Sequence, residues 1–337
     1  MLYVGIDLHR RTSRIVAMDA AGTVISQRTV ASDRASVEDA FNRIERPAEA
    51  VFEATWGWGW LADLLEEMGI PAHMAHPLQT RAISAARVKN DAIDARTLAH
   101  LLRTNMVPES WIAPPEVREA RRQVRMRVAL GRIRTGVKQQ VHALLGEHGI
   151  RLEHSDTFGV KGWKELEALQ LPEFSRHRLD SCLRLITVLD GEIEHADFEL
   201  LTAFGGDDRV ARLRAIPGIG FLTAVTVLAE VGDISRFGSA AQLCSWAGLT
   251  PREHSSAQHI KRGHISKQGS RWLRWILVEA AATNKACKGE DLRDFQQRIA
   301  KRRGKMIARV AVARRLLTLC YYALNSQDGC RAYPLLR

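Results

Sequence analysis

The stretch Met1-Leu2-Tyr3-Val4-Gly5-Ile6-Asp7-Leu8 decides how the first part of the chain folds. It is a short apolar run with β-branched and aromatic residues, which is typical of a buried strand. One carboxylate, Asp7, lies inside it, and a charge on a buried strand is costly unless another group compensates it. On this stretch alone, the simpler interpretation is a strand-end aspartate satisfied by backbone amides or by Arg10 or Arg11. Three further acidic residues in the first hundred positions favour a functional interpretation instead.

The segments that follow predict a mixed sheet flanked by helices. Residues 12–19 and 23–30 are two more strands with short links, as in an antiparallel meander. A helix with Ser36 as its N-cap is predicted through about Ile44. The remaining elements are strands at 50–53 and 70–75 and helices at 58–68, after Pro77 and at 91–102. This βββαβαβα order predicts an α/β domain of RNase H-like fold over residues 1–106.

Four carboxylates in this domain are candidates for a metal site. Glu53 ends its predicted strand, and ligands gather at the carboxyl ends of strands in such sheets. Asp91 and Asp94 share one helix face, where two carboxylates repel each other unless a cation lies between them. With Asp7, they could hold two Mg²⁺ or Mn²⁺ ions in the arrangement used for in-line phosphodiester displacement. The alternative for the isolated Asp91–Asp94 pair is a helix cap and its capping-box partner.

Actin-like ATPases also begin with a strand that reads Gly-Ile-Asp and continues into a hairpin. They place a glycine-rich phosphate turn directly after the aspartate. This chain has His9-Arg10-Arg11 there, with no glycine to let backbone amides approach a phosphate. Nucleotide hydrolysis is therefore not the function that the sequence favours.

The composition of the chain indicates in which compartment it works and which class of partner it binds. The 337 residues suggest two or more domains, and the net charge of +11 indicates a polyanionic partner, nucleic acid before a membrane surface. The five cysteines form no C-x-x-C pair, which favours a reducing cytoplasm and disfavours a structural zinc site. The apolar runs are too short to span a bilayer, and no signal-peptide pattern precedes the first strand. We therefore expect a cytoplasmic protein without a membrane partner.

A basic helical region is predicted over residues 107–205, after a linker marked by Pro108, Pro114 and Pro115. Its first helix runs from Glu116 to about His148 and carries many arginines with few acids in the same segment. Contact with backbone phosphates is the favoured interpretation, and a solvated charged face is the alternative. The candidate contacts are Arg118, Arg121, Arg122, Arg125, Arg132 and Lys138, and Arg127 and Arg134 lie in the same stretch.

The second helix of this region, from about Pro172 to Phe204, has a heptad pattern. One set of apolar positions repeats every seven residues, and a second set follows each of them by three. The two sets are Leu179, Ile186, Ile193, Leu200 and Cys182, Leu189, Ala196, Ala203. A coiled coil is predicted, either within the chain or between chains.

Residues 206–337 are predicted to be an all-α region. Ala215-Ile-Pro-Gly-Ile-Gly220 opens a helix at 221–231 and is typical of a helix-hairpin-helix element. Gly218 and Gly220 would let backbone amides approach a DNA phosphate, and a plain tight turn is the alternative. A polar, irregular loop is expected at 252–263, then a helix at 271–283 and two more helices with Lys301-Arg302-Arg303 between them.

Taken in order, these motifs resemble a known family, the DEDD transposases of bacterial insertion sequences whose recombination is guided by a bridge RNA. The resemblance covers roughly residues 1–325. Its motifs are Gly5-Ile-Asp7, Glu53-Ala-Thr, Lys89-Asn-Asp91-Ala-Ile-Asp94-Ala, Ile216-Pro-Gly-Ile-Gly, Ala247-Gly-Leu-Thr-Pro and Ile265-Ser-Lys-Gln-Gly-Ser. It implies a RuvC-like N-terminal domain whose Asp7, Glu53, Asp91 and Asp94 bind Mg²⁺. It also implies donor and target DNA, a structured guide RNA, and a homo-oligomer, either a dimer or a tetramer.

The resemblance further implies a serine nucleophile in the C-terminal domain. In the family, a Ser-Gly loop between the Leu-Thr-Pro and Ile-Ser-Lys motifs supplies it, and Ser256 matches by spacing. Ala257 stands where glycine is usual, and Ser255 remains a second candidate. A serine hydroxyl needs a base or a metal to activate it, which the acidic residues and Mg²⁺ of the other domain would supply. Candidates for phosphate contact nearby are Lys261, Arg262 and Lys267, with His254, His259 and His264 unassigned.

Three functions follow from this sequence. The leading one is a DNA transposase or recombinase with a composite active site. The second is a Mg²⁺-dependent, structure-specific nuclease that uses only the four carboxylates and water, like a Holliday-junction resolvase. The third is a nucleic-acid-binding scaffold, which the intact set of four carboxylates disfavours.

Overall fold

The structure is a computed structural model that describes residues 1–83, 91–256, 259–283 and 290–326. The chain divides into two compact units, Met1–Ala113 and Pro114–Arg337, and each is described by itself. None of the helices in the described ranges is both long enough and apolar enough to cross a membrane.

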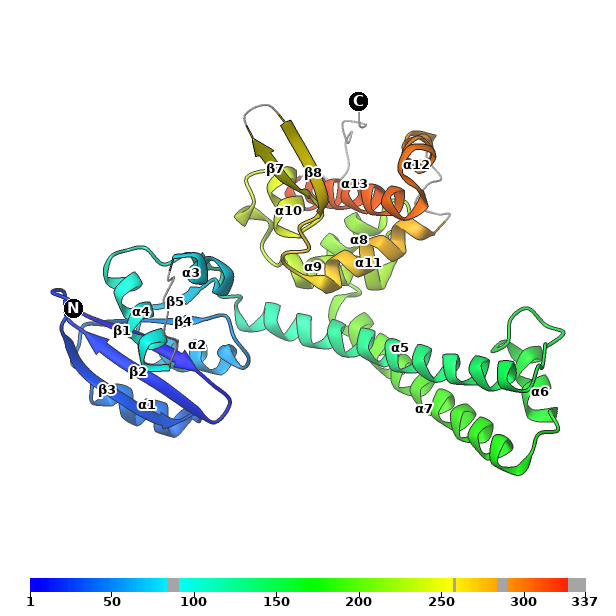
Figure 1. The fold of residues 1–337 in the computed structure, drawn as a ribbon, viewed down its shortest axis with the longest axis horizontal. Coiled ribbons are helices and arrows are strands. Elements are labelled where there is room, and N and C mark those ends of the chain that lie inside the picture. The colour runs from blue at the N-terminus through cyan, green and yellow to red at the C-terminus, as the bar shows by residue number, and fades with distance from the viewer. Residues whose placement is uncertain (84–90, 257–258, 284–289, 327–337) are drawn as a thin grey trace. The chain divides into compact units, whose positions relative to one another are not determined.

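A six-stranded mixed sheet forms the first unit (Figure 1). Its strand order is β3-β2-β1-β4-β5-β6, in which β1 and β4, and β4 and β5, pair in parallel and the other neighbours pair antiparallel. The strands are β1 (Leu2–Leu8), β2 (Thr12–Met18), β3 (Val24–Ala31), β4 (Ala48–Glu53), β5 (Ala72–Ala75) and β6 (Glu109–Ser110). The mixed sheet that the sequence predicted is confirmed, with β6 as a short strand inside the predicted linker.

Helices cover both faces of this sheet. On one face, Ile6 of β1 packs with Phe41 of α1 and Leu65 of α2 in a buried cluster. On the other face, Val51 of β4 packs with Leu98 of α4. The helices are α1 (Arg34–Asn42), α2 (Trp58–Glu67), α3 (Pro77–Ile83) and α4 (Asp91–Arg103). The face covered by α4 carries the residues that matter for function.

The N-cap of α1 differs from the prediction. Asp33, not Ser36, caps the helix, because its carboxylate accepts a hydrogen bond from the backbone N–H of Ser36 at 2.9 Å. The hydroxyl of Ser36 donates to the same carboxylate at 2.9 Å. These hydrogen bonds favour the charged form and lower the pKa of Asp33. Two possible caps three residues apart are easily confused in a sequence, and here the carboxylate is the cap.

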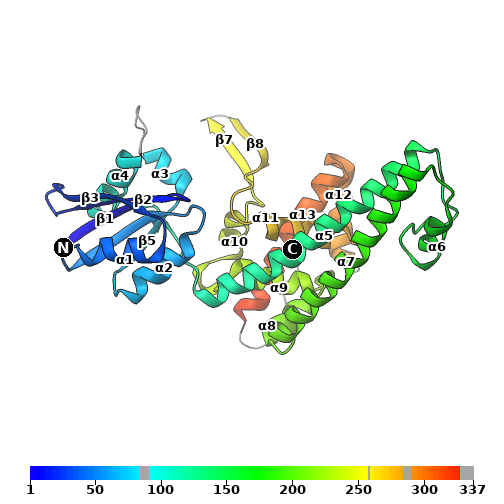
Figure 2. The same cartoon turned by 90° about the horizontal axis from the view of Figure 1, so that it is seen from below.

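Two long helices begin the second unit, α5 (Pro115–Glu147) and α7 (Glu173–Phe204), and they run side by side (Figures 1 and 2). The short α6 (Val160–Ala168) lies between them in sequence. Heptad positions of α7 are buried against α5, which contributes Val141 and Leu144 to their shared core. The buried heptad residues are Leu179, Ile186, Ile193, Ala196 and Leu200. The repeat thus describes a helical pair within one chain.

The rest of the second unit is a helical core with one small hairpin. Its helices are α8 (Asp208–Arg214), α9 (Phe221–Val231), the 3-10 helix η1 (Ile234–Arg236), α10 (Ala240–Trp246), α11 (Arg271–Ala282), α12 (Glu290–Arg303) and α13 (Lys305–Asn325). The predicted boundary between residues 205 and 206 does not separate two units. Val124 of α5 and Leu200 of α7 belong to the same buried core as Leu277 and Leu316, which ties the long helices to the C-terminal ones.

The prediction of an irregular loop at residues 252–263 is wrong. This segment forms an antiparallel hairpin of β7 (Pro251–Ser256) and β8 (His259–Ile265), so the region is not all-α. The strand residues whose exposure the structure describes, such as Arg252, Glu253 and His264, are exposed or half-exposed. A hairpin without a buried face leaves no apolar alternation in its sequence, which explains the error.

Candidate active site

Gly5 brings helix α4 against the centre of the sheet. A Cβ atom at Gly5 would lie 2.0 Å from the carbonyl oxygen of Ala95 and 2.6 Å from the amide nitrogen of Ala99. Those are backbone atoms of α4, so no side chain fits at this position of β1. The glycine of the Gly5-Ile6-Asp7 motif is therefore required for the approach of the helix that carries Asp94.

Asp7 and Glu53 end neighbouring parallel strands. The last recorded pair between β1 and β4 joins Ile6 to Phe52, and the two acidic residues follow this pair directly. Side chains alternate between faces along a strand, and Ile6 and Phe52 lie in the core under α1 and α2. Asp7 and Glu53 therefore belong to the opposite face, which α4 covers. Thr55 strengthens this edge by donating a hydrogen bond from Oγ1 to the carbonyl oxygen of Leu8 at 3.5 Å.

Asp94 approaches the same face from α4. Leu98 and Leu102 of α4 are buried against Val51, and Asp94 lies one helical turn before Leu98. Residues four apart share one helix face, so the half-buried Asp94 lies on the side directed at the sheet. Asp91 is the first residue of α4, but its side chain lies outside the described part of the structure.

The donor set suits a hard divalent cation. The groups are carboxylates, they come from β1, β4 and α4, and they meet at one edge of one sheet face. Within the described side chains, which do not include that of Asp91, no three His, Cys, Asp or Glu residues form a metal-binding group. The fold thus brings Asp7, Glu53 and Asp94 to one region, and metal binding by them remains a prediction.

Two basic residues beside Asp7 were not identified as site residues from the sequence. His9 is half-exposed, and its Nε2 lies 3.0 Å from Oδ2 of Asp7. Arg14 of β2 pairs directly with Asp7 across the antiparallel ladder, so its side chain shares the face of that carboxylate. Its Nη1 donates to Oγ1 of Thr29, while its Nε is buried without a hydrogen-bond partner in the described structure. Only the strand register could have revealed Arg14.

The candidate nucleophile lies at the end of the hairpin. Ser256 is the last residue of β7 and pairs with His259, and Ser255 pairs with Ile260. Lys261 and Arg262 lie on β8, paired with His254 and Glu253. The side chains of residues 254–262 are outside the described part of the structure, as are residues 257 and 258 altogether. The two serines are neighbours on one strand, so their side chains belong to opposite faces of the hairpin.

Two motifs interlock at the root of this hairpin. A Cβ atom at Gly248 would lie 2.3 Å from the carbonyl oxygen of Gln268, and one at Gly269 would lie 2.1 Å from the carbonyl oxygen of Trp246. Both glycines also have positive φ, of 70° and 65°. Nη1 of Arg274 donates to the carbonyl oxygens of Ala247 at 3.0 Å and Gly269 at 3.2 Å. The Ala-Gly-Leu-Thr-Pro and Ile-Ser-Lys-Gln-Gly-Ser motifs thus fix where the hairpin leaves the helical core.

The sequence is similar to those of known transposases. The model of the transposase IS116/IS110/IS902 family matches residues 210–297, and a transposase model for the DEDD enzymes of IS110 elements matches residues 4–150. A putative transposase y4qE of Sinorhizobium fredii is 31% identical, over 83% of this chain and 71% of its own length. The chain belongs to this transposase family. A probable family 20 transposase of Pseudomonas aeruginosa is 28% identical over 97% of both chains, and the IS1111A transposase of Coxiella burnetii is 26% identical over 97% of this chain and 91% of its own.

The chain is accordingly an enzyme of the DNA transposase and recombinase class, and DNA is its partner. The DEDD family also indicates that the reaction depends on a divalent metal. These findings confirm the resemblance to DEDD transposases of insertion sequences, and guidance by a bridge RNA stays a prediction.

In this transposase, two of the predicted phosphate contacts hold helices together. Arg125 forms a double hydrogen bond with the carboxylate of Glu230, at 2.8 and 2.9 Å, and the Glu230 side chain is 2% exposed. Arg121 donates to the backbone carbonyls of Ala229 and Glu230, both at 2.9 Å. The shortage of acids on α5 did not reveal these partners, because they come from α9 rather than from the same helix, and nucleic-acid contact by Arg121 and Arg125 stays a prediction.

Other basic residues of α5 also have partners in the second unit. Arg127 pairs with Asp197 and Arg134 with Asp190, both on α7, while Arg122 pairs with Glu119 within α5 at 2.8 Å. Arg132 stacks over Trp272 and Trp275 of α11, with its guanidinium carbon 4.7 and 5.6 Å from the ring centroids. The ammonium of Lys138 lies 4.7 Å from the Phe158 ring centroid. Nucleic-acid contact by Arg118, Arg122, Arg132 and Lys138 remains a prediction.

The turn before α9 has the backbone that its glycines predict. Gly218 adopts a φ of 89°, which suits glycine, and Gly220 is the N-cap residue of α9 with open space around its Cα. α8 and α9 pack against each other on either side of this turn. Phosphate binding by Gly218 and Gly220 is compatible with this open N-terminus and remains untested. Lys267 is exposed and has a φ of 58° at the root of the hairpin.

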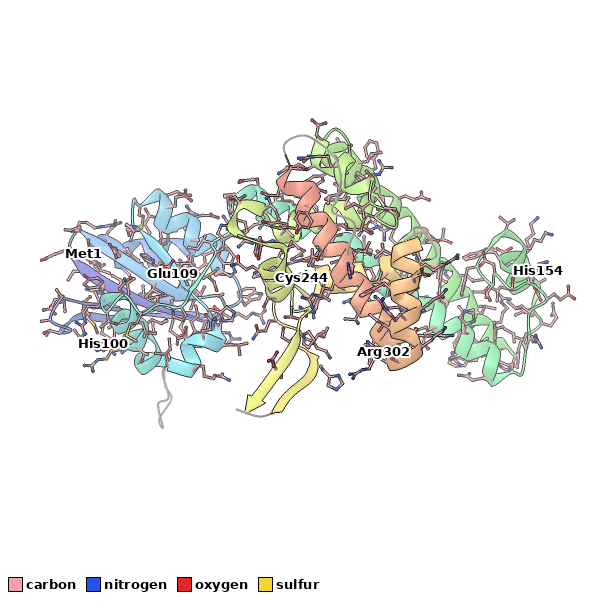
Figure 3. All side chains as sticks on the ribbon, turned by 90° about the horizontal axis from the view of Figure 1, so that it is seen from above. Met1, His100, Glu109, His154, Cys244 and Arg302 are labelled. Carbon is pink, nitrogen blue, oxygen red and sulfur yellow. The ribbon has the colours of Figure 1, made fainter. Side chains whose placement is uncertain are left out.

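Two of the described cysteines, Cys244 and Cys320, are unsuited to nucleophilic attack. Cys182, Cys244 and Cys320 are free thiols, and Cys244, marked in Figure 3, is buried in α10. Burial raises the pKa of Cys244, and it raises the pKa of Cys320 to about 12. Thiolates, not thiols, attack phosphorus or disulfides, so neither buried cysteine competes with the serine as a nucleophile.

Proposed function

We propose that this transposase cuts and rejoins DNA with a serine nucleophile and Mg²⁺ or Mn²⁺ ions, guided by a bridge RNA, in the bacterial cytoplasm. The observation that carries the proposal is the placement of Asp7, Glu53 and Asp94 on one face of one sheet edge. Gly5 supports it, because a glycine is needed there only to admit the helix that carries Asp94.

Each candidate residue has a role in this reaction. Asp7, Glu53, Asp91 and Asp94 would hold the ions through their carboxylate oxygens. When bound, such ions neutralise charge on the phosphate and make an oxygen nucleophile more reactive. Ser256 Oγ attacks the scissile phosphorus, forms a bond to the 5′-phosphate and releases a strand with a free 3′-hydroxyl. Rejoining reverses this step, as a 3′-hydroxyl attacks the same phosphorus and the serine leaves.

Phosphate contacts outside the chemical step complete the proposal. Lys261, Arg262 and Lys267 lie on or beside the hairpin that carries Ser256. Gly218 and Gly220 would present the N-terminus of α9 to a DNA phosphate. These groups would position the strand without reading its sequence.

We extend the proposal to assembly as a dimer or a tetramer. α7 exposes five large apolar side chains, namely Phe174, Leu185, Val188, Phe198 and Leu201. An apolar stripe of this kind on a helical pair suits packing against a second copy of the same pair. Sedimentation velocity tests this part, since Leu185→Glu with Val188→Glu should give monomers while the wild-type chain associates.

The first experiment tests the carboxylates. Asp7→Ala, Glu53→Ala, Asp91→Ala and Asp94→Ala should each abolish strand cleavage in Mg²⁺ and leave nucleic-acid binding largely intact. Glu66→Ala is the matched control, because Glu66 is an exposed carboxylate on α2, under the opposite face of the sheet. Wild-type cleavage by the Asp7, Glu53 and Asp94 variants would exclude the acidic set as the metal site.

The second experiment tests the serine. A denaturing gel after incubation with target DNA should show a covalent protein–DNA adduct that Ser256→Ala lacks and Ser255→Ala retains. The opposite pattern would move the nucleophile to Ser255. Cleavage without any adduct would favour the nuclease, in which water attacks and only the carboxylates are needed.

A further inference from the structure

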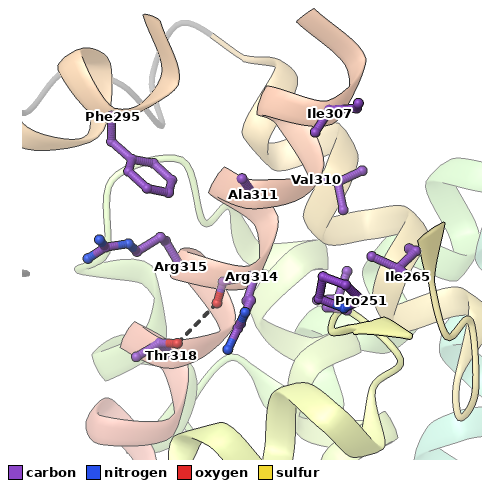
Figure 4. Close-up of a pocket in the computed structure, with 10 residues that line it drawn as sticks. Pro251, Ile265, Phe295, Ile307, Val310, Ala311, Arg314, Arg315 and Thr318 are labelled. Atoms are coloured by element: carbon purple, nitrogen blue, oxygen red, sulfur yellow. Dashed lines mark hydrogen bonds between the residues drawn. The ribbon is translucent and has the colours of Figure 1, made fainter. Parts of the chain in front are cut away.

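A cavity of about 510 Å³ lies at the root of the hairpin, between β7, β8, α12 and α13 (Figure 4). Most of its wall is apolar, and Thr318 and two arginines supply the polar groups. The lining residues are Leu249, Pro251, Ile265, Phe295, Ile307, Val310, Ala311, Arg314, Arg315 and Thr318. Its size and its mixture of an apolar wall with a few polar groups are those of small-ligand sites.

Three guanidinium groups lie in or near this cavity. Arg314 and Arg315 of α13 line it, and Arg298 of α12 lies on the same ring as Arg315. None of the three forms an ion pair with a carboxylate among the described residues, in contrast to the arginines of α5. Burial lowers the pKa of Arg315, and the positive charges of Arg298 and Arg314 lower it further. Cations held together without an acid form a site for an anion.

An aromatic ring lies beside these cations. The Phe295 ring centroid is 4.5 Å from the guanidinium carbon of Arg315 and 5.9 Å from that of Arg298. In Figure 4, Phe295 and Arg315 lie on one side of the cavity, and Pro251 and Ile265 lie across from them. Aromatic rings and guanidinium planes are the surfaces on which proteins stack unpaired bases.

We propose that this cavity binds one unpaired nucleotide of a nucleic-acid strand. The base would enter the apolar part and stack on Phe295, and its phosphate would be held by Arg298, Arg314 and Arg315. This proposal deepens the proposed function, on which it rests for a nucleic-acid partner. The site differs from the serine site, because Pro251 and Ile265 are at the root of the hairpin and Ser256 is at its other end.

The cavity favours a nucleotide over an apolar segment of a second copy of the chain. An apolar protein side chain would fill the cavity but would supply no anion to the three cations, which have no acidic partner among the described residues. Basic residues continue along α12 to Lys301, Arg302 and Arg303 in its last turn, and Arg302 is marked in Figure 3. These cations extend the positive charge beyond the cavity, where the phosphates next to the bound nucleotide would lie.

The test measures the affinity of the full chain for a duplex with one bulged nucleotide. Fluorescence anisotropy in EDTA compares three probes, namely the bulged duplex, the same duplex with an abasic bulge, and the fully paired duplex. DNA and RNA versions of each probe show which strand supplies the nucleotide. The wild-type chain should bind the base-containing bulge about 5-fold to 100-fold more tightly than the abasic one, in DNA, in RNA or in both.

Variants at Phe295 separate stacking from packing. Phe295→Leu keeps an apolar side chain but removes the ring, so this variant should bind the base-containing bulge and the abasic bulge about equally tightly. Phe295→Tyr keeps the ring and should keep the preference. An abasic bulge bound as tightly as the complete one by the wild-type chain would overturn the proposal, and so would an unchanged preference in Phe295→Leu. A change confined to sedimentation behaviour would instead assign the cavity to a second copy of the chain.

The phosphate part has its own measurement. Arg314→Gln combined with Arg315→Gln should weaken all probes and reduce the slope of log affinity against log salt by about two, with the base preference retained. An unchanged slope would overturn the assignment of these arginines. A 5-iodouracil at the bulge should crosslink to a peptide within residues 290–318, and crosslinks confined to other peptides would also overturn the site.

The outcome is separable from that of the proposed function. All binding is measured without divalent ions and repeated in Ser256→Ala, so it requires neither cleavage nor an adduct. Loss of the base preference in an enzyme that still forms the adduct rejects the nucleotide site alone. A base preference in a wild-type chain that forms no adduct rejects the serine mechanism alone.

Discussion

The arginines of α5 and the arginines of α12 and α13 are similar in sequence and opposite in surroundings. On α5, Arg121 and Arg125 donate to carbonyls and a carboxylate of α9. On α12 and α13, Arg298 and Arg315 face one aromatic ring, and Arg314 lines a cavity. Both segments look like basic helices along the chain, yet one set holds the protein together and the other is open to a ligand.

This difference shows what a count of charges along one helix leaves out. The acids that pair with α5 come from positions far along the chain, such as Asp197 and Glu230. A helix can therefore lack internal acids and still have most of its arginines engaged. Whether an arginine can contact nucleic acid depends on how the neighbouring helices pack against it. The same substitution, arginine to glutamine, at positions with different partners tests this difference.

The largest effect is expected from Arg125→Gln. The substitution leaves the buried carboxylate of Glu230 without its cation, which should lower the free energy of unfolding by about 3 kcal/mol. Urea unfolding followed by circular dichroism measures the change. Arg122→Gln is the control, because its partner Glu119 is exposed, and the expected loss there is about 0.5 kcal/mol or less. Equal losses in the two variants would remove the structural role assigned to Arg125.

A smaller loss is expected from Arg132→Gln. Its guanidinium stacks over Trp272 and Trp275, and exposed cation–π pairs contribute about 0.5–1 kcal/mol. The same unfolding experiment measures it, and Arg132→Lys should keep part of the stability because it keeps the charge. If Arg132→Gln instead leaves stability unchanged and flattens the salt dependence of nucleic-acid binding, Arg132 contacts nucleic acid, as proposed for Arg298, Arg314 and Arg315.

Almost no loss is expected from Arg314→Gln combined with Arg315→Gln. The substitution removes repulsion among three neighbouring cations, and this gain offsets the lost cation–π contact between Arg315 and Phe295, so the free energy of unfolding should stay constant or rise by about 0.5 kcal/mol or less. The measurement is the urea midpoint at low and high salt, and the rise should vanish at high salt because screening already weakens the repulsion. A clear loss of stability would show that these arginines are structural, like Arg125.

Acid should affect the paired region first. Hydrogen bonds from Arg178 and Arg176 lower the pKa values of Glu147 and Asp180 below their ordinary ranges. Because these values are depressed in the folded state, the pairs stabilise the protein at neutral pH and are lost as the pH falls through the folded pKa values, below about pH 4. Hydrogen-exchange protection factors at the end of the α5–α7 pair near α6, which are corrected for the slower intrinsic exchange in acid, should therefore fall on acidification, and Arg178→Gln should abolish the part due to Glu147.

The sequence predicted the first unit well because β1, β2 and β4 at the centre of its sheet carry mostly buried residues. The strands β1 and β4 carry apolar runs, and the acids that break those runs mark the edge where the site lies. The requirement for Gly5 could not be read from the run itself, since it depends on where α4 crosses the strand. Arg14 could not be predicted as a site residue for the same reason, because only the register between β1 and β2 places it beside Asp7.

The second unit was predicted less well, for physical reasons that differ by element. The heptad pattern correctly predicted the long helix α7, because burial against α5 imposes a seven-residue period on its apolar residues. The β7–β8 hairpin has no described buried face and left no period. The boundary at residues 205 and 206 failed because Val124 of α5 is far in sequence from the core that it completes.

The interlocked glycines at the hairpin root have a consequence for substitutions elsewhere in the hairpin. Gly248 and Gly269 meet carbonyl oxygens of the chain rather than side chains, and backbone contacts are the same whatever residues the strands carry. Substitutions along the two strands therefore leave these backbone contacts in place, and the hairpin keeps the direction in which it leaves the helical core.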